Sequence, residues 1–266
     1  MMNQTKPFTV PDFLARKGNK PIVMITAADF TMARLMDSTG MVDSLLVGDS
    51  LGTVVQGRAN TLAVTLEQMI YHTEMVVRGS SQAMVIADMP FGSYQESIEQ
   101  AIKNASRVIK ETGCTAVKLE GGRYFAPTVA ALVQCGIPVF GHVGLMPQHV
   151  HSMGGYKVQR NEQKIIDDAM AIAEAGAFGI VLECLPAEIA ASITGGIKVP
   201  TIGIGAGPSC DGQVLVGHDL LGIFEGHRPK FVRPYADLKS VIRDAVSRFA
   251  GDVHNRVFPN SNESFK

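Results

Sequence analysis

Short apolar runs alternate with amphipathic segments along the whole chain. Eight runs rich in β-branched or aliphatic residues are each followed by a loop and then by a segment with helical periodicity. The expected strands are residues 21–27, 43–48, 83–88, 115–120, 138–142, 178–183, 199–204 and 213–216. These runs are apolar on both faces, as in strands enclosed between a barrel interior and an outer helical layer. The pattern predicts an α/β fold, a (β/α)8 TIM barrel.

Capping patterns mark the starts of two helices between strands. Ser93 and Glu96 have the spacing of a capping box, and Gly113 is placed to end the helix that they begin. The apolar stripe of this helix consists of Ile98, Ala101, Ile102, Ala105, Val108 and Ile109. Thr65 and Gln68 have the same spacing, so they predict a second helix start.

We expect one domain, residues 1–266, with a short N-terminal helix and a C-terminal tail. The 266 residues are close to the roughly 250 typical of a single barrel, and no linker rich in Pro, Ser or Gly divides them. Residues 161–176 and 236–249 have helical periodicity, and the second of these segments is expected to be the last barrel helix. The polar tail from Gly251 is expected to be loosely held.

Composition and charge favour small molecules as the binding partners of this protein. Apolar residues make up 46% of the chain, charged residues 18%, and the formal net charge is -1, which favours neither disorder nor nucleic-acid binding. The start lacks the basic and apolar regions of a signal peptide, and no apolar run is long enough to span a membrane. Four widely spaced cysteines, without a C-x-x-C pair, indicate reduced thiols and a cytoplasmic protein.

Acidic residues close three neighbouring predicted strands. Asp49 follows the second strand, while Asp88 and Glu120 end the third and the fourth. Catalytic residues of TIM barrels lie at the C-terminal ends of the strands, so these three carboxylates are expected at one corner of the barrel mouth. Oxygen ligands without His or Cys suit Mg²⁺, which keeps waters that a chelating 2-oxo acid can displace. The alternative is that each carboxylate caps the helix that follows it.

Three further polar side chains are expected at the same mouth. Lys118 lies two residues before Glu120 and therefore on the same face of its strand, where a solvated lysine is the alternative. Glu183 closes the sixth strand and could act as a general base, or it could interact with the helix that Pro186 begins. His142 closes the fifth strand and could bind a substrate oxygen, orient a ligand or be a structural histidine.

Two further sequence patterns could indicate other functions, but each is only weakly specific. Cys184 could be a nucleophile, but no partner base is evident from its spacing, and free cysteines are usually packing residues. The glycine-rich residues 203–207 lack the full G-x-G-x-x-G spacing of a dinucleotide site, so close backbone approach at the barrel rim is the preferred interpretation.

Several motifs together resemble the ketopantoate hydroxymethyltransferase family. They are Val47-Gly48-Asp49-Ser50-Leu51-Gly52, Val55-Gln56-Gly57, Asp88-Met89-Pro90-Phe91, Lys118-Leu119-Glu120-Gly121-Gly122, Gly154-Gly155-Tyr156-Lys157-Val158-Gln159 and Asp211-Gly212-Gln213. Each string alone is weakly specific, whereas their order and spacing from about Thr26 to Phe258 are highly specific.

The resemblance implies transfer of a hydroxymethyl group from 5,10-methylenetetrahydrofolate to 3-methyl-2-oxobutanoate, forming 2-dehydropantoate for pantothenate and coenzyme A synthesis. It implies a barrel of the phosphoenolpyruvate/pyruvate-domain type, Mg²⁺, and a cytoplasmic homodecamer built from two pentamers. The matching positions imply metal ligands at Asp49, Asp88 and Glu120, substrate binding by Asp49, Ser50, Asp88, Lys118 and His142, and a catalytic proton acceptor at Glu183.

The expected reaction passes through an enolate stabilised by Mg²⁺ and Lys118 after Glu183 removes the C3 proton. Exclusion of water requires closure, for which residues 153–161 are the candidate mobile loop. An alternative enzyme is a carbon-carbon lyase like phosphoenolpyruvate mutase or isocitrate lyase, although the K-K-C-G-H loop associated with that lyase is absent. A non-catalytic barrel is a further alternative, which would leave the acidic strand ends and Lys118 without a purpose.

Overall fold

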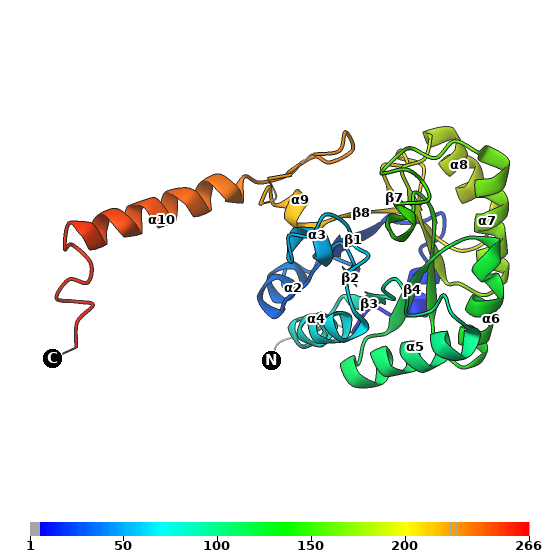
Figure 1. Ribbon diagram of the computed structural model, residues 1–266, viewed down its shortest axis with the longest axis horizontal. Helices are drawn as coiled ribbons and strands as arrows, with labels where there is room; N and C mark the ends of the chain where they lie inside the picture. Colours follow the sequence, from blue (N-terminus) through cyan, green and yellow to red (C-terminus); the bar gives the residue numbers. More distant parts are fainter. Residues whose placement is uncertain (1–5, 224, 227, 266) are drawn as a thin grey trace. The chain divides into compact units, whose positions relative to one another are not determined.

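Eight parallel strands form a closed barrel in chain order, which confirms the predicted fold class (Figure 1). The computed structural model describes residues 6–223, 225–226 and 228–265. The strands are β1 (Ile22–Thr26), β2 (Ser44–Val47), β3 (Met84–Asp88), β4 (Ala116–Glu120), β5 (Val139–Gly144), β6 (Gly179–Glu183), β7 (Thr201–Ile204) and β8 (Gly212–Leu215). Each expected strand segment thus overlaps an observed strand, with small shifts at the ends.

Helices surround the strands, and α4 to α8 can be followed around the outside of the barrel in Figure 1. The helices are α1 (Val10–Leu14), α2 (Phe30–Asp37), α3 (Leu51–Val54), α4 (Leu66–Gly79), α5 (Ile98–Thr112), α6 (Ala126–Gln134), α7 (Glu162–Glu174), α8 (Ala187–Gly196), α9 (Gly217–Leu220) and α10 (Leu238–His254). Two short 3-10 helices, η1 (Arg123–Phe125) and η2 (Pro147–His149), lie in the loops after β4 and β5.

Aromatic side chains fill the N-terminal end of the barrel. Phe13 of α1 is completely buried and packs edge-to-face against Phe140 and Phe178, with ring centroids 5.5 and 5.3 Å away. Phe140 is the second residue of β5, and Phe178 directly precedes β6. Because apolar side chains occupy this end, the polar residues at the other ends of the strands are left to form the opposite mouth.

The predicted capping box at Ser93 and Glu96 is wrong. The helix begins later, because Ser97 is the N-cap of α5 and its hydroxyl accepts a hydrogen bond of 3.1 Å from the amide of Gln100. Ser93 instead belongs to the preceding turn, where its hydroxyl donates to the carbonyl of Pro90 at 2.6 Å. Two serines four residues apart both satisfy the capping pattern, and the turn after β3 decides which of them caps.

The other helix boundaries agree better with the pattern. Thr65 and Gln68 form the reciprocal capping box at the start of α4. Gly113 ends α5 in the left-handed conformation, with a φ of 75°. Asn161 caps α7, as the predicted helix at residues 161–176 requires. These starts and stops depend on contacts within one turn of the chain, which is why local sequence predicts them.

The chain separates into two compact units, Met1–Val216 with the barrel and Gly217–Lys266. In the second unit, α10 confirms the helix expected at 236–249, but it continues through Gly251, where a tail was expected. None of the residues of α10 is buried, so its role as the last barrel helix stays a prediction, as does the single-domain organisation. Among the described residues, no helix has both the length and the apolar character needed to cross a membrane.

Candidate active site

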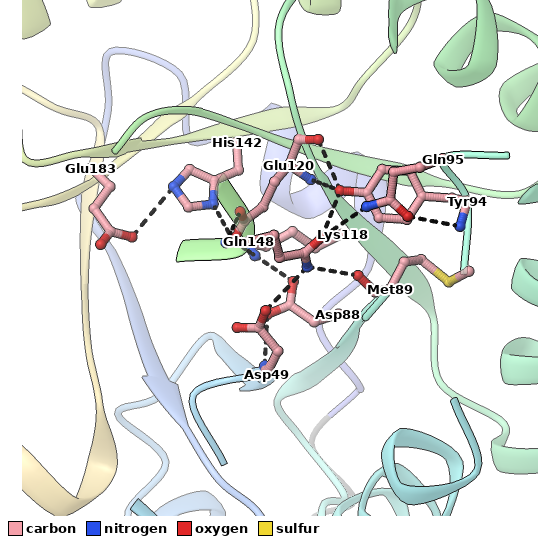
Figure 2. Close-up of polar contacts among 10 residues, drawn as sticks. All are labelled: Asp49, Asp88, Met89, Tyr94, Gln95, Lys118, Glu120, His142, Gln148 and Glu183. Carbon is pink, nitrogen blue, oxygen red and sulfur yellow. Dashed lines mark hydrogen bonds and ion pairs between the residues drawn. The ribbon is translucent and has the colours of Figure 1, made fainter. Parts of the chain in front are cut away.

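Three buried carboxylates meet at the C-terminal ends of β2, β3 and β4 (Figure 2). Strand register pairs Val47 with Ala87 and Asp88 with Lys118, so the three strands end at a common level. The backbone amide of Asp49 donates to Oδ2 of Asp88 at 3.0 Å. The predicted convergence of Asp49, Asp88 and Glu120 is therefore found, and we call these three residues the acidic corner.

Lys118 neutralises part of the charge of the acidic corner. Only 4% of this residue is exposed, which excludes a solvated lysine. Its ammonium donates to Oδ1 of Asp88 and lies 3.9 Å from Oε1 of Glu120, on the strand face expected from its spacing. Burial opposes the charge of this ammonium, but the neighbouring carboxylates, chiefly those of Asp88 and Glu120, raise the pKa of Lys118 above its ordinary value.

Helix capping does not account for the strand-end carboxylates. Ser50, rather than Asp49, is the N-cap of α3, and its side chain makes no capping hydrogen bond. Glu120 is followed by η1, whose N-cap is Gly122, and Glu183 precedes α8, whose N-cap is Pro186. Asp49 and Glu120 therefore do not cap the helices that follow them. Glu183 lies just before the N-terminus of α8, so its interaction with that helix stays an alternative.

His142 lies between the acidic corner and Glu183. Its Nδ1 atom is 3.5 Å from Oε1 of Glu120, and its Nε2 atom is 3.3 Å from Oε2 of Glu183. Burial and Lys118 oppose protonation of the imidazole, but Glu120 and Glu183 outweigh them and raise the pKa of His142 to about 9. The Glu183 side chain is 17% exposed, so this carboxylate, unlike the acidic corner, is partly accessible to solvent.

Sequence reasoning missed Gln148 and Tyr94, which lie beside the acidic corner. The Nε2 atom of Gln148 donates to Oδ2 of Asp49 at 3.1 Å, and its backbone amide donates to Oε2 of Glu120 at 3.0 Å. The buried Tyr94 hydroxyl lies 2.9 Å from Oε1 of Gln148 and 2.9 Å from the carbonyl of Glu120. The only sequence signal for Gln148 is its place in the loop after a strand, at the catalytic end of a barrel.

The acidic corner has the electrostatics of a cation site. Burial, together with the charges of Asp88 and Glu120, raises the pKa of Asp49 to about 8. Burial likewise raises the pKa of Asp88, against the opposing effect of Lys118. At Glu120 burial acts in the same direction, but the nearby imidazole of His142 and the charge of Lys118 hold the pKa below its usual value. A divalent cation would stabilise all three carboxylates in their ionised form.

The donor set fits a hard divalent cation such as Mg²⁺. All three side chains offer oxygen, and within the described part of the chain Oε1 of Glu120 is buried without a hydrogen-bond partner. Across residues 6–223, 225–226 and 228–265, however, no three His, Cys, Asp or Glu side chains already stand in ligand geometry. A site of three carboxylates therefore requires at least one of these side chains to turn when an ion binds.

Ser50 lies near Asp88 at the end of β2. A Cβ atom built on Gly48 would come 3.0 Å from Oγ of Ser50 and 3.5 Å from Oδ2 of Asp88. Glycine at position 48 thus keeps open the space beside these two polar groups. The Ser50 hydroxyl makes no capping contact with α3, which is consistent with its predicted role in substrate binding.

The two weaker patterns have structural explanations. Burial and the charge of Glu183 raise the pKa of Cys184 to about 12, so its thiol is protonated and poorly suited to nucleophilic attack. A Cβ atom on Gly207 would lie 2.6 Å from Cβ of Ala187, which supports close approach of the chain at the rim after β7.

Comparison with solved structures defines the class of the barrel. A 2,3-dimethylmalate lyase of the PEP mutase/isocitrate lyase superfamily superposes with a TM-score of 0.60 at 16% identity, covering 96% of this chain and 91% of that one. A phosphonopyruvate hydrolase in complex with oxalate and Mg++ has a TM-score of 0.63 at 12% identity, with coverage of 97% and 93%. The fold is therefore a TIM barrel similar to the barrels of these two proteins, and the acidic corner lies at the C-terminal ends of its strands.

Sequence comparison identifies the family. The family described as ketopantoate hydroxymethyltransferase matches residues 7–261. The 3-methyl-2-oxobutanoate hydroxymethyltransferase of Pelobacter propionicus is 52% identical over 269 residues, covering all of both chains. The enzyme of the same name from Moorella thermoacetica is 51% identical over 270 residues, again with full coverage of both. The chain belongs to the ketopantoate hydroxymethyltransferase family.

Proposed function

We propose that the chain transfers a hydroxymethyl group from 5,10-methylenetetrahydrofolate to 3-methyl-2-oxobutanoate, forming 2-dehydropantoate in pantothenate biosynthesis. The observation that carries this proposal is the buried acidic corner, with Lys118 beside it and Glu183 connected to it through His142. Full-length relatives named for the same reaction support the substrate assignment.

Asp49, Asp88 and Glu120 would hold Mg²⁺ in this proposal. When bound, the cation supplies charge stabilisation to the oxygens of a chelating 2-oxo acid. The oxygen-only donor set and the unpartnered Oε1 of Glu120, taken among the described residues, support this choice. The Mg++ complex of the phosphonopyruvate hydrolase supports it further at the level of the shared barrel.

Glu183 would act as the base that takes the proton from C3 of the 2-oxo acid. Its side chain is partly exposed, so a substrate at the barrel mouth can reach it, and the Nε2 atom of His142 is 3.3 Å from one of its oxygens. Lys118 would offset the negative charge that develops on the keto oxygen when the proton leaves. Ser50 and His142 would bind substrate oxygens beside these two groups. The resulting C3 nucleophile would bond to the one-carbon unit of the folate as the bond from that carbon to the folate nitrogen breaks and the nitrogen takes up a proton, so that tetrahydrofolate leaves. One water, consumed in opening the 5,10-methylene bridge, would supply the hydroxyl oxygen of the product.

Residues 153–161 would close over the reacting groups and exclude bulk water. The aromatic residue of this segment is Tyr156, which is 53% exposed. Burial and the charges of Asp49, Glu183 and Glu120 raise the pKa of its phenol. Loop closure would bring this ring and its neighbours toward the barrel mouth.

The chain would act in the cytoplasm as a homodecamer of two pentamers, as the family resemblance implies. Its four cysteines are all free thiols, which supports a reducing compartment. Light scattering tests the assembly directly. The expected mass is ten times the 28.5 kDa of one chain, and the mass of a single chain would contradict the decamer.

Proton-deuterium exchange at C3 of 3-methyl-2-oxobutanoate, followed by NMR without folate, tests the mechanism. We expect exchange by the wild type with Mg²⁺, none with EDTA, and a rate lower by about 10²–10⁴-fold in Glu183→Gln. Glu188→Gln, at an exposed position of α8, is the matched control and should exchange like the wild type. Wild-type protein that exchanges neither with nor without folate would overturn the mechanism. Full exchange by Glu183→Gln would overturn the assignment of the base.

A further inference from the structure

Gln148 makes direct contacts to two residues of the acidic corner from a loop that belongs to neither of their strands. It lies in η2, after β5, and only 3% of the residue is exposed. Its side chain donates to Oδ2 of Asp49, 99 residues away in sequence, and its backbone amide donates to Oε2 of Glu120. One residue thus contacts the carboxylates that end two different barrel strands (Figure 2).

The hydrogen bonds of Gln148 fix the orientation of its amide group. The Nε2 atom faces two acceptors, Oδ2 of Asp49 and the carbonyl of Met89, the latter at 3.0 Å. The Oε1 atom faces the hydroxyl of Tyr94 and the Nε2 donor of Gln95, at 2.9 and 3.1 Å. A flipped amide would set its oxygen against the Asp49 carboxylate and the Met89 carbonyl, and its nitrogen against the nitrogen of Gln95. Only the observed orientation satisfies these three neighbours, while the Tyr94 hydroxyl can donate or accept.

These contacts also distinguish the two oxygens of each carboxylate. Gln148 donates to Oδ2 of Asp49 and to Oε2 of Glu120. The other oxygen of Glu120, Oε1, has no hydrogen-bond partner among the described residues. A ligand carboxylate anchored in this way loses less rotational freedom when it binds an ion.

We propose that Gln148 is a positioning residue whose side chain orients Asp49 for the divalent cation, with Tyr94 and Gln95 holding the oxygen of its amide in place. The inference rests on the metal site of the proposed function. In a purely structural role, Gln148 would only hold the loop after β5 against the barrel, and its substitution would change stability but not metal affinity.

Binding of Mn²⁺ alone, measured by the loss of the EPR signal of the free ion, tests the inference without catalysis. Gln148→Met keeps the length of the side chain but removes its amide, so we expect the Kd for Mn²⁺ to rise by about 10–100-fold. Tyr94→Phe keeps the Gln148 side chain but removes the hydroxyl that contacts its oxygen and the backbone of Glu120. Its Kd should rise by a smaller factor in the same direction.

The matched control is Gln163→Met on α7, where an exposed glutamine donates to Oδ1 of Asp167 at 2.7 Å. It should bind Mn²⁺ like the wild type. Steady-state kinetics give a second readout, since the Mg²⁺ concentration for half-maximal activity should rise in Gln148→Met more than kcat at saturating Mg²⁺ falls. Circular dichroism checks folding, and if Gln148→Met does not fold, Tyr94→Phe decides the question.

Wild-type affinity for Mn²⁺ in folded Gln148→Met, or in Tyr94→Phe when that variant alone folds, would overturn the inference and leave the metal site intact. Failure of the metal site itself would give one of two other results. Wild-type protein that binds no Mn²⁺, or Asp88→Asn that binds it as tightly as the wild type, would overturn the acidic corner as the metal site and the inference with it.

Discussion

The imidazole of His142 approaches the carboxylate of Glu183 within 3.3 Å, from Nε2 to Oε2. The two residues lie on adjacent strands, where His142 pairs with Val181, two residues before Glu183. The opposite ring nitrogen faces Glu120, so the position of the proposed base is connected to that of a proposed metal ligand. A change at this ring should therefore affect both groups.

His142→Phe should lower kcat by about 10–100-fold, because it keeps a buried ring but removes both nitrogens that face Glu120 and Glu183. C3 exchange without folate should fall by a similar factor, since the base itself is affected. His254→Phe, at an exposed position of α10, serves as the control. Unchanged exchange in His142→Phe would show that the ring has only a packing role.

Lys118→Met should lower the free energy of unfolding by about 3–5 kcal/mol in EDTA, because it leaves the buried Asp88 without its cationic partner and Glu120 with His142 alone. Urea denaturation measures the difference, with Lys110→Met as a control at an exposed position of α5. Equal urea midpoints for Lys118→Met and the wild type would contradict this prediction. They would mean that protonation of the acidic corner replaces the charge of Lys118 without loss of stability.

Gly144→Ala should reduce both activity and stability. The glycine has a φ of 103°, and a Cβ atom there would lie 2.3 Å from the carbonyl oxygen of Glu183. Gly136→Ala is the control for backbone strain alone, since Gly136 has a φ of 80° and nothing within 4 Å of its Cβ position. Each substitution should cost about 1–3 kcal/mol in strain, but only Gly144→Ala should displace Glu183 and lower kcat. Equal kcat values in the two variants would contradict this steric argument.

Asp37→Asn should destabilise the barrel unit by about 1.5–3 kcal/mol at pH 7, as expected for loss of hydrogen bonds to a charged group. The buried carboxylate at the end of α2 accepts backbone hydrogen bonds from Ser81, Gln82 and Ala83, at 2.9, 3.1 and 2.7 Å. Urea denaturation of both proteins gives the difference in the free energy of unfolding. A surface substitution, Asp244→Asn on α10, should change it little.

The stability difference between the wild type and Asp37→Asn should also depend on pH. Burial opposes the charge of Asp37, but its backbone hydrogen bonds outweigh burial and lower the pKa of this carboxyl in the folded state. The contribution of its charge is therefore fully present above the ordinary pKa and is lost as the pH falls through the lower folded value. The stability difference between wild type and Asp37→Asn should shrink below about pH 4. A difference that grows on acidification would contradict the direction of this pKa shift.

Local features of the chain were predicted well where neighbouring residues determine them. The strand segments, the Thr65 capping box and the Gly113 helix end depend on periodicity and on contacts within a single turn. Even there, two serines near α5 compete, and Ser97 rather than Ser93 caps because the loop after β3 uses Ser93 in its own turn. Propensity alone does not resolve such a choice.

The sequence by itself determined the barrel, the family and the strand-end residues. Asp49, Asp88 and Glu120 stand at the C-terminal ends of adjacent parallel strands, and strand register brings these ends together at one mouth of the barrel. Their convergence therefore follows from their positions in the sequence. Only the tertiary structure decided the contacts of His142 with two carboxylates and of Gln148 with Asp49. Those contacts depend on loop conformation and side-chain rotamers across large sequence separations, which periodicity and motif spacing do not encode.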